Sequence, residues 1–370
     1  MGRFDDVRLA LEAATGGRNT LLTDDLGLPS VMVRIPRFRW CDVLDGGENA
    51  PCSAFVVGGE VKDCIYISKY LNVIESGRAY SLPARTPANY MTIDEAREAC
   101  AKKGPGWHLL TNAEWMAVAH WSRKNGTLPR GNNEFGHDIL HSHEAGVRAT
   151  GAFMIEPEKT ELTLTGTGPV SWTHDGTSAG ICDLHGNMWD HTAGLRVKDG
   201  ELQIIADNDS ALNVDESPDS PLWRAIGTDG RLVSPGSPGT YKYDGVNEGN
   251  DDNTSITGVP GGVCLSTSVE RPQYTGPEAD ASYAYVYMYF RNMAAAPGVP
   301  VHILLKELGL YPVSPDMDPV YLFVRNYGER YAARGGSWYD SYVGGLWDTY
   351  LRDSREYVYP DLGFRAAYID

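Results

Sequence analysis

The sequence predicts an α+β fold in which two capped helices lie beside short strands and long irregular segments. Residues 92–95 (Thr-Ile-Asp-Glu) and 111–114 (Thr-Asn-Ala-Glu) are capping boxes, and a glycine follows each of the two segments that they open. A Thr N-cap with a Glu three residues later is typical of a helix start, and a glycine past the last turn is typical of a helix end. We therefore predict helices over residues 92–103 and 111–124.

Short strands are the second observation. Residues 30–36 (SVMVRIP) and 64–69 (CIYISK) are rich in β-branched and aromatic residues, which favour strands. Residues 283–289 alternate Tyr with Ala, Val and Met, which predicts a strand with tyrosines on one face. Two further short helices are predicted over residues 4–15, closed by a Gly-Gly pair, and over residues 301–309.

Irregular composition is the third observation. Residues 126–180 and 206–262 are rich in Gly, Thr, Asn, Asp, Ser and Pro and show little periodicity. Backbone of this kind has to be satisfied by turns, side chains and water rather than by regular elements. We therefore expect a small, poorly regular sheet.

The bulk composition excludes several classes of function. The chain has 370 residues, a hydrophobic content of 42% and a net charge of −17. Such a chain can bury a core, but it has no basic stripe, so nucleic acid and anionic membrane surfaces are not expected as partners. The first residues lack the apolar stretch of a signal peptide, and no apolar run is long enough to span a membrane. We expect synthesis in the cytoplasm and no membrane insertion.

The six cysteines form no CxxC pair. Cys41, Cys52 and Cys64 are spaced so that either neighbouring pair could bridge, but in a long chain we expect most of the cysteines to be free, buried thiols.

The C-terminal segment has two ordered ends around an unusual middle. Its ends are Arg-Gly-Gly-Ser-Trp at 334–338 and Gly-Phe-Arg at 363–365, and residues 339–361 hold five Tyr, four Asp, one Trp and no Lys. Tyr gives a large rigid contact area with a hydroxyl, so this composition is typical of a recognition surface. The predicted ligand-binding residues, expected to be exposed on one face, are Tyr339, Asp340, Tyr342, Asp348, Tyr350, Arg352, Asp353, Tyr357, Tyr359 and Asp361. The aromatic residues expected in the core are Trp115, Trp189, Trp338 and Phe364.

The order of motifs resembles a known family. VMVRIPRF within residues 30–38, IYISKYLNV at 65–73, WHLLTNAEWMAVAHW at 107–121, GICDLHGNMWDHTAGL at 180–195 and the C-terminal RGGSW and GFR follow one another. This order resembles the formylglycine-generating-enzyme branch of the C-type-lectin fold. The resemblance covers about residues 29–370, with insertions at about 200–262, and leaves residues 1–28 as an N-terminal helix and lead-in.

Within that branch the chain is most similar to the variable proteins of diversity-generating retroelements, many of them in phages and prophages. The resemblance implies that residues 338–362 are varied by adenine-templated errors and form the ligand-binding face. All ten predicted binding residues can be reached from an Asn codon by changing its adenines, whereas Trp347 and Glu356 cannot. A phage receptor-binding protein on the virion tail is implied, with a protein or glycan on a host or target cell as partner. Residues 1–28 would serve tail attachment or homo-oligomer formation.

Two other functions remain open. A formylglycine-generating oxygenase would need a closely placed thiol pair in the C-terminal region, but the last cysteine is Cys264. A calcium-dependent lectin would carry Glu-Pro-Asn or Trp-Asn-Asp, which are absent. We therefore expect no catalytic residues, no enzyme activity and no cofactor.

Three polar clusters have alternative interpretations. His137, His141 and His143 could bind a metal, but a loop that lies beside the binding face is favoured, and no metal site is expected. The Asp-Asn-Asp at 207–209 and the Asn-Asp-Asp at 250–252 could bind calcium, although turns explain them more simply. The polar residues of the GNMWD motif region are expected to be scaffold rather than catalytic: Asp183, His185, Asn187 and Asp190, with Trp189.

Overall fold

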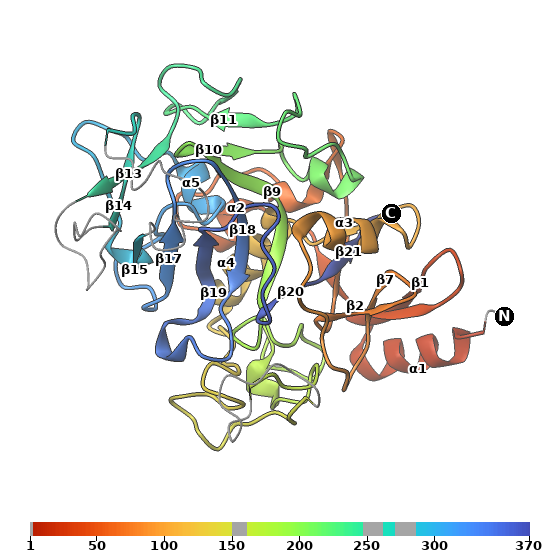
Figure 1. The fold of residues 1–370 in the computed structure, drawn as a ribbon. Helices are drawn as coiled ribbons and strands as arrows, with labels where there is room; N and C mark the ends of the chain where they lie inside the picture. The colour runs from red at the N-terminus through yellow and green to blue at the C-terminus, as the bar shows by residue number, and fades with distance from the viewer. Residues whose placement is uncertain (1–2, 150–160, 247–261, 271–285) are drawn as a thin grey trace.

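The chain adopts an α+β fold dominated by strands (Figure 1). The computed structural model describes residues 3–149, 161–246, 262–270 and 286–370. Two main sheets, one of five and one of twelve strands, and two short hairpins make up the described β-structure.

Both capping boxes form, and the helices begin where the sequence predicts. In each, the Glu backbone N–H donates to the Thr hydroxyl, at 3.2 Å for Glu95 and 3.1 Å for Glu114, and the Glu carboxylate accepts from the Thr backbone N–H. The described α-helices are α1 (Asp5–Thr15), α2 (Trp40–Val43), α3 (Ile93–Ala101), α4 (Asn112–Asn125) and α5 (Ile303–Glu307). Of these only α2, a single turn, was not predicted. Short 3-10 turns occur at Ser53–Phe55, Val170–Trp172, Asp209–Leu212, Phe290–Asn292 and Ser341–Val343.

The five-stranded sheet is antiparallel throughout, in the order β1-β2-β5-β21-β8. Its strands are β1 (Asn19–Thr23), β2 (Pro29–Pro36), β5 (Cys64–Ser68), β8 (Trp107–Leu109) and β21 (Ala366–Tyr368). The strands predicted at 30–36 and 64–69 are β2 and β5. The hairpins are β3 (Val56–Val57) with β4 (Glu60–Val61), and β6 (Asn72–Glu75) with β7 (Arg78–Ser81).

The larger sheet corrects the expectation of a small one. Its main path runs β15-β17-β19-β18-β9-β10-β13-β14-β16, with β11, β12 and β20 attached at its sides. These strands are β9 (Trp189–Lys198), β10 (Glu201–Ile204), β11 (Arg224–Ile226), β12 (Leu232–Val233), β13 (Lys242–Val246), β14 (Gly262–Ser266), β15 (Val286–Tyr289), β16 (Ala294–Ala295), β17 (Tyr321–Val324), β18 (Glu329–Gly335), β19 (Gly345–Leu351) and β20 (Leu362–Phe364).

The described part of the predicted insertion extends this sheet. It supplies β10 to β13 at the upper left of Figure 1, and β11 to β13 lie within residues 206–262, where the sequence indicated irregular backbone. Strands of two to five residues are too short to show a hydrophobic period, and their pairing partners are set by the fold rather than by local sequence. The predicted strand at 283–289 is described only as β15, which pairs with β17; Tyr283 and Tyr285 lie outside the described residues.

The core joins α4 to the sheets. Nearly all of α4 is buried, and it packs against β9. The four aromatic residues that we placed in the core are buried, with exposed fractions of 1% for Trp338, 2% for Trp115, 4% for Trp189 and 0% for Phe364. The Trp115 indole N–H donates to the Leu346 carbonyl at 2.7 Å, which links α4 to β19.

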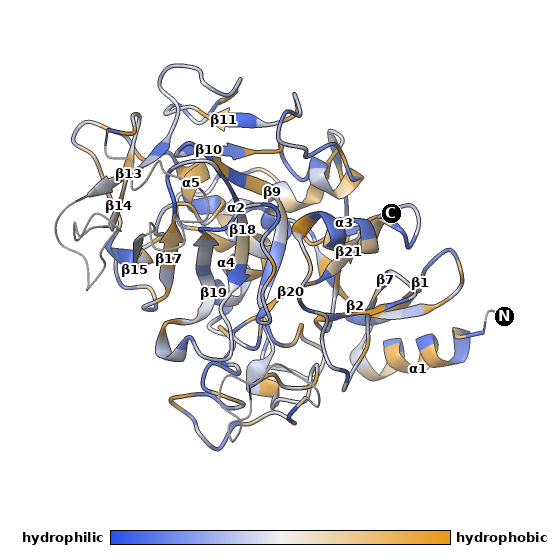
Figure 2. Ribbon diagram, viewed as in Figure 1, coloured by the Kyte–Doolittle hydropathy of each residue, from blue (hydrophilic) through white to orange (hydrophobic). Residues whose placement is uncertain are grey.

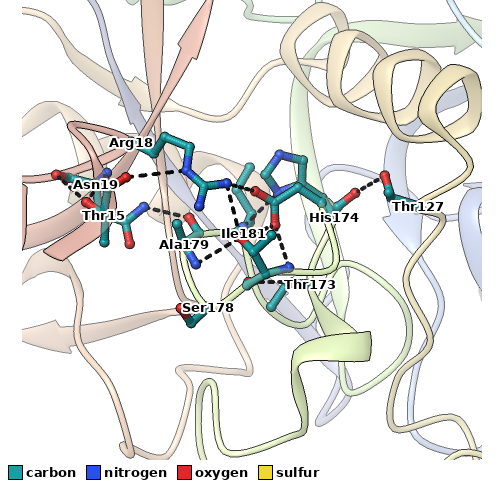
Figure 3. Close-up of polar contacts among 12 residues, drawn as sticks. Thr15, Arg18, Asn19, Thr127, Thr173, His174, Ser178, Ala179 and Ile181 are labelled. Atoms are coloured by element: carbon teal, nitrogen blue, oxygen red, sulfur yellow. Dashed lines mark hydrogen bonds and ion pairs between the residues drawn. The ribbon is translucent and has the colours of Figure 1, made fainter.

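The N-terminal lead-in rests on the edge of the molecule. None of the residues of α1 is buried, although the helix carries hydrophobic residues in Figure 2. Just after it, Arg18 pairs with Asp175 at 2.9 Å and the Asn19 amide donates to the Ala179 carbonyl at 2.6 Å (Figure 3). These contacts fix the lead-in to the loop before β9. Among the described helices, none has the length and apolar character needed to cross a membrane.

Candidate ligand-binding site

Two buried arginines hold the ends of the C-terminal segment. Arg334, at the end of β18, donates to the Asn112 side-chain oxygen at 2.7 Å and to the Leu308 carbonyl at 3.1 Å. Arg365, just after β20, pairs with Asp190 at 2.9 Å and donates to the Asp183 carbonyl at 2.5 Å. Both arginines are fully buried, so the two ends are anchored in the interior.

Both ends also pair with the same strand. β18 runs antiparallel to β9, and β20 runs parallel to it, which pairs Leu362 with Trp189. Figure 1 shows β18 and β20 on either side of β9. The residues between these ends therefore start and finish on one rigid strand.

The glycine pair of the RGGSW motif is required by close packing. Gly335 has φ +97° and Gly336 has φ +79°, which L side chains rarely adopt. A Cβ on Gly335 would lie 2.9 Å from the Leu184 carbonyl oxygen and 3.0 Å from the Trp115 ring. The motif thus lets β18 turn against α4.

The histidine-containing loop lies beside this segment, as expected. The Phe135 N–H donates to the Trp338 carbonyl at 2.7 Å, and the Ser341 N–H donates to the Asn133 carbonyl at 2.8 Å. Within the loop, His141 Nδ1 lies 3.0 Å from an Asp138 carboxylate oxygen. Among the residues that the structure describes, no group of three or more His, Cys, Asp or Glu is placed to hold a metal ion.

Eight of the ten predicted binding residues line one cavity of about 290 Å³. They are Tyr339, Asp340, Tyr350, Arg352, Asp353, Tyr357, Tyr359 and Asp361. Trp189 of β9, Phe323 of β17 and Leu362 of β20 complete the lining. We call this the C-terminal cavity. Tyr342 and Asp348 do not line it.

The expectation that the ten residues would be largely exposed is wrong for most of them. Tyr339, Tyr342 and Tyr359 are exposed, whereas Asp340, Tyr350, Arg352 and Tyr357 are half-buried and Asp348, Asp353 and Asp361 are buried. Asp348 is the clearest case, with an exposed fraction of 0%. It lies in β19, which pairs with β17 on one side and β18 on the other. Six of the seven residues of β19 are buried, so both faces of this strand are covered and only part of the middle of the segment lies at the surface.

Aromatic rings form the floor of the C-terminal cavity. Trp189 packs against Phe323 and Tyr350 with ring centroids 5.9 and 5.0 Å apart, and Phe323 and Tyr350 are 5.2 Å apart. Tyr357 and Tyr359 stack on each other at 5.8 Å with an interplanar angle of 15°. Three contacting rings and a stacked pair give the cavity rigid aromatic surface.

Three carboxyl groups face this aromatic surface. Burial raises the pKa of Asp340 to about 7, and the nearby Asp361 carboxylate adds to the rise. Burial also raises the pKa of Asp361, to about 6, and raises the pKa of Asp353. Asp353 accepts from Arg352 Nε at 3.3 Å through one oxygen, while its buried Oδ2 has no hydrogen-bond partner among the described residues.

Phe323 was missed from the sequence. The signal that could have found it is the alternation at 321–324, where Tyr321 and Phe323 are half-buried and Leu322 and Val324 are buried. Trp189 was expected only in the core, but one edge of it reaches the C-terminal cavity.

The other polar clusters have internal partners. Asn208 accepts from the Thr111 hydroxyl and donates to the Ala54 carbonyl, and Asp209 accepts from the Gly58 N–H. In the GNMWD region, the Asn187 side-chain oxygen accepts from the Thr163 N–H at 2.9 Å. Residues 250–252 lie outside the described residues, so the calcium alternative stays untested.

The cysteines are thiols and not disulfides. Cys52, Cys100, Cys182 and Cys264 are buried as expected, but Cys64 is half-buried and Cys41 is exposed. None of the six, all of which are described, forms a disulfide.

Comparison with known proteins gives little to add. No protein-family model matches the chain, and no curated protein matches it. One solved structure, named Major Tropism Determinant P3c Variant, is similar at 11% sequence identity with a TM-score of 0.30, over 95% of this chain and 71% of that chain. A likeness at this level does not decide the fold.

Proposed function

We propose that this chain is a non-catalytic binding protein that recognises a protein or a glycan on a host or target cell through the C-terminal cavity. The observation that carries the proposal is the convergence of eight Tyr, Asp and Arg residues, chosen from the sequence by composition, on one cavity. Convergence of this kind is expected of a binding site and has no simple explanation as core packing.

Recognition through this cavity needs no chemistry beyond contact. The ring cluster supplies area, the carboxyl groups and Arg352 supply polar specificity, and the anchored ends hold the segment in place before the ligand arrives. A site that is ordered in advance loses less entropy on binding, so a small cavity can contribute to a useful affinity.

The experiment is a cell-binding assay with a matched pair of triple variants. Tyr339, Tyr357 and Tyr359 are changed together to Ser in one variant. Val61, Val170 and Leu212, which are exposed and lie outside the cavity lining, are changed to Ser in the other. Labelled proteins are incubated with a panel of bacterial cells and with a glycan array. We expect the tyrosine variant to lose binding at least tenfold and the control to keep it. Equal binding by both variants would refute the proposal.

We further propose that the chain belongs with the variable proteins of diversity-generating retroelements, and that it sits on a phage tail. The support is the motif order at 30–365 and the codon pattern of the ten residues. Sequencing the neighbouring DNA tests this directly. A reverse-transcriptase gene and a near-copy of codons 338–362 that differs at adenines are expected, and their absence would remove the assignment without touching the binding assay.

A further inference from the structure

The C-terminal cavity combines rings with an excess of negative charge. Among the residues that the structure describes, its walls carry the carboxyl groups of Asp340, Asp353 and Asp361 and one guanidinium, that of Arg352, with no lysine or histidine. The whole chain is also strongly acidic, with a net charge of −17. An anionic ligand group would meet repulsion in this cavity, and an apolar neutral group would leave Asp353 Oδ2 without a partner.

The guanidinium of Arg352 already contacts a tyrosine ring and a carboxylate at the cavity wall. The guanidinium carbon of Arg352 lies 5.0 Å from the centre of the Tyr350 ring, and its Nε lies 3.3 Å from Asp353 Oδ1. A cation within about 6 Å of a ring centre is attracted by the electrons of the ring face. Arg352 therefore shows, within the protein itself, how a ring and a carboxylate of this cavity bind a cation.

Unused groups remain for a second cation. Asp353 is buried, lines the cavity and keeps its Oδ2 without a hydrogen-bond partner among the described residues. The stacked tyrosines 357 and 359 and the indole of Trp189 provide ring surface in the same cavity. A buried carboxylate oxygen without a partner is costly, and a cationic group that enters the cavity would satisfy it.

We propose that the C-terminal cavity receives a positively charged organic group of the ligand, an ammonium or a guanidinium, against its rings and the free oxygen of Asp353. The cavity volume of about 290 Å³ lies just below the range for small-molecule sites, roughly 300–1,000 Å³, so the cavity fits a group the size of a side-chain end. This inference rests on the proposed function, because it names the chemistry of the ligand for that same site.

The test compares a cation with its neutral isostere on the full chain. Choline and 3,3-dimethylbutan-1-ol have the same shape and differ in charge, and methylguanidinium tests the second cation class. Each is titrated by calorimetry and by ligand-observed NMR at pH 8, with sodium chloride held constant. We expect choline or methylguanidinium to bind at least tenfold more tightly than the neutral alcohol. Equal binding of the cations and the alcohol, or no binding of either cation, would overturn the proposal.

Two variants locate the effect. Asp353→Asn removes the charge with little change of shape, and Asp63→Asn is its control because Asp63 is an exposed acid outside the cavity lining. We expect Asp353→Asn to weaken cation binding at least fivefold and Asp63→Asn to leave it unchanged. Should Asp353→Asn fail to fold, Tyr359→Leu, at an exposed position, replaces it and should also weaken cation binding. The comparison of cation with alcohol uses the unaltered chain and so does not depend on either variant.

The outcome separates this inference from the proposed function. If the triple tyrosine variant loses cell binding while choline and the alcohol bind equally, the cation proposal fails and the binding function stands. If cells bind the triple variant normally while choline still binds the cavity selectively, the binding function fails and the cation site stands.

Discussion

The ends and the middle of the C-terminal segment both bury charge, but they partner it in different ways. At the ends, Arg334 bonds to Asn112 and Leu308, and Arg365 bonds to Asp190 and Asp183, all of them far away in the sequence. In the middle, two of the carboxylates have local partners: Asp340 accepts from Ser337, and Asp353 accepts from Arg352.

The difference teaches which residues specify the fold. Charges at the ends tie the segment to α4 and β9, so changing them disturbs the scaffold. In the middle, Arg355 also pairs outside the segment, with Asp94, but the carboxylates of Asp340 and Asp353 bond within it. Burial raises the pKa of Asp340, Asp353 and Asp361. Buried carboxyl groups with raised pKa values are unfavourable for folding, and such groups are typical of functional sites. We therefore expect substitutions in the middle to be tolerated better than substitutions at the ends.

Breaking an anchor should have the largest effect. Arg365→Ala leaves Asp190 buried without its cation, and we expect a loss of about 3–5 kcal/mol in the free energy of unfolding. Urea denaturation followed by tryptophan fluorescence measures it. Arg231→Ala, in an exposed pair with Asp229, is the control and should cost less than about 0.5 kcal/mol. A loss as small as that of the control would show that the ends are not anchored as described.

A backbone change at the first anchor should come next. Gly335→Ala puts a Cβ against the Leu184 carbonyl at a positive φ, and strain of this kind costs about 1–3 kcal/mol. Gly236→Ala is the matched control, since Gly236 has φ +79° with nothing within 4 Å of its Cβ. Thermal unfolding of the two variants should separate the cost of crowding from the cost of φ alone; equal melting temperatures would contradict the packing argument.

The middle should respond to pH in the opposite sense from a paired carboxylate. Burial raises the pKa of Asp340 to about 7 and of Asp361 to about 6, above the ordinary value near 3.9. The native state therefore binds protons more tightly than the unfolded chain, and stability should fall as pH rises from about 4 to 7.

The variant Asp340→Asn tests that slope. Its amide oxygen can still accept from Ser337, but it no longer titrates beside Asp361, Asp353 and Arg352. We expect stability at pH 8 to rise by on the order of 1 kcal/mol and the slope between pH 4 and 7 to become shallower. Denaturation curves across that range measure both, and an unchanged slope would mean that Asp340 does not titrate as its burial predicts.

The smallest effect is expected at the exposed tyrosines. Changing Tyr339, Tyr342 and Tyr359 together to Ser should alter the free energy of unfolding by no more than about 1 kcal/mol, as ordinary surface substitutions do. Differential scanning calorimetry measures it. A large loss would place these rings among the residues that hold the fold and would erase the contrast between ends and middle.

Local signals predicted the helices, and composition selected eight of the residues that line the C-terminal cavity, although we expected an exposed face there. The capping boxes at Thr92 and Thr111 depend only on residues within one turn, so they could be read directly from the sequence. The size of the larger sheet could not, because β10 to β13 are short and their partners lie elsewhere in the chain. For the same reason the burial of Asp348 was missed, since local sequence does not show that β19 lies inside the larger sheet with both of its faces covered.

Both β18 and β20 pair with β9, and this has a consequence for how the protein folds. Synthesis delivers β9 and its neighbour β10 early, while β18 and β20 follow only after a long stretch of chain. Until then, the backbone of β9 is without two of its strand partners, and pairing across such a distance in sequence is slow. We expect refolding to be rate-limited by this closure and to pass through an intermediate prone to aggregation, which a chaperone or a low protein concentration would protect.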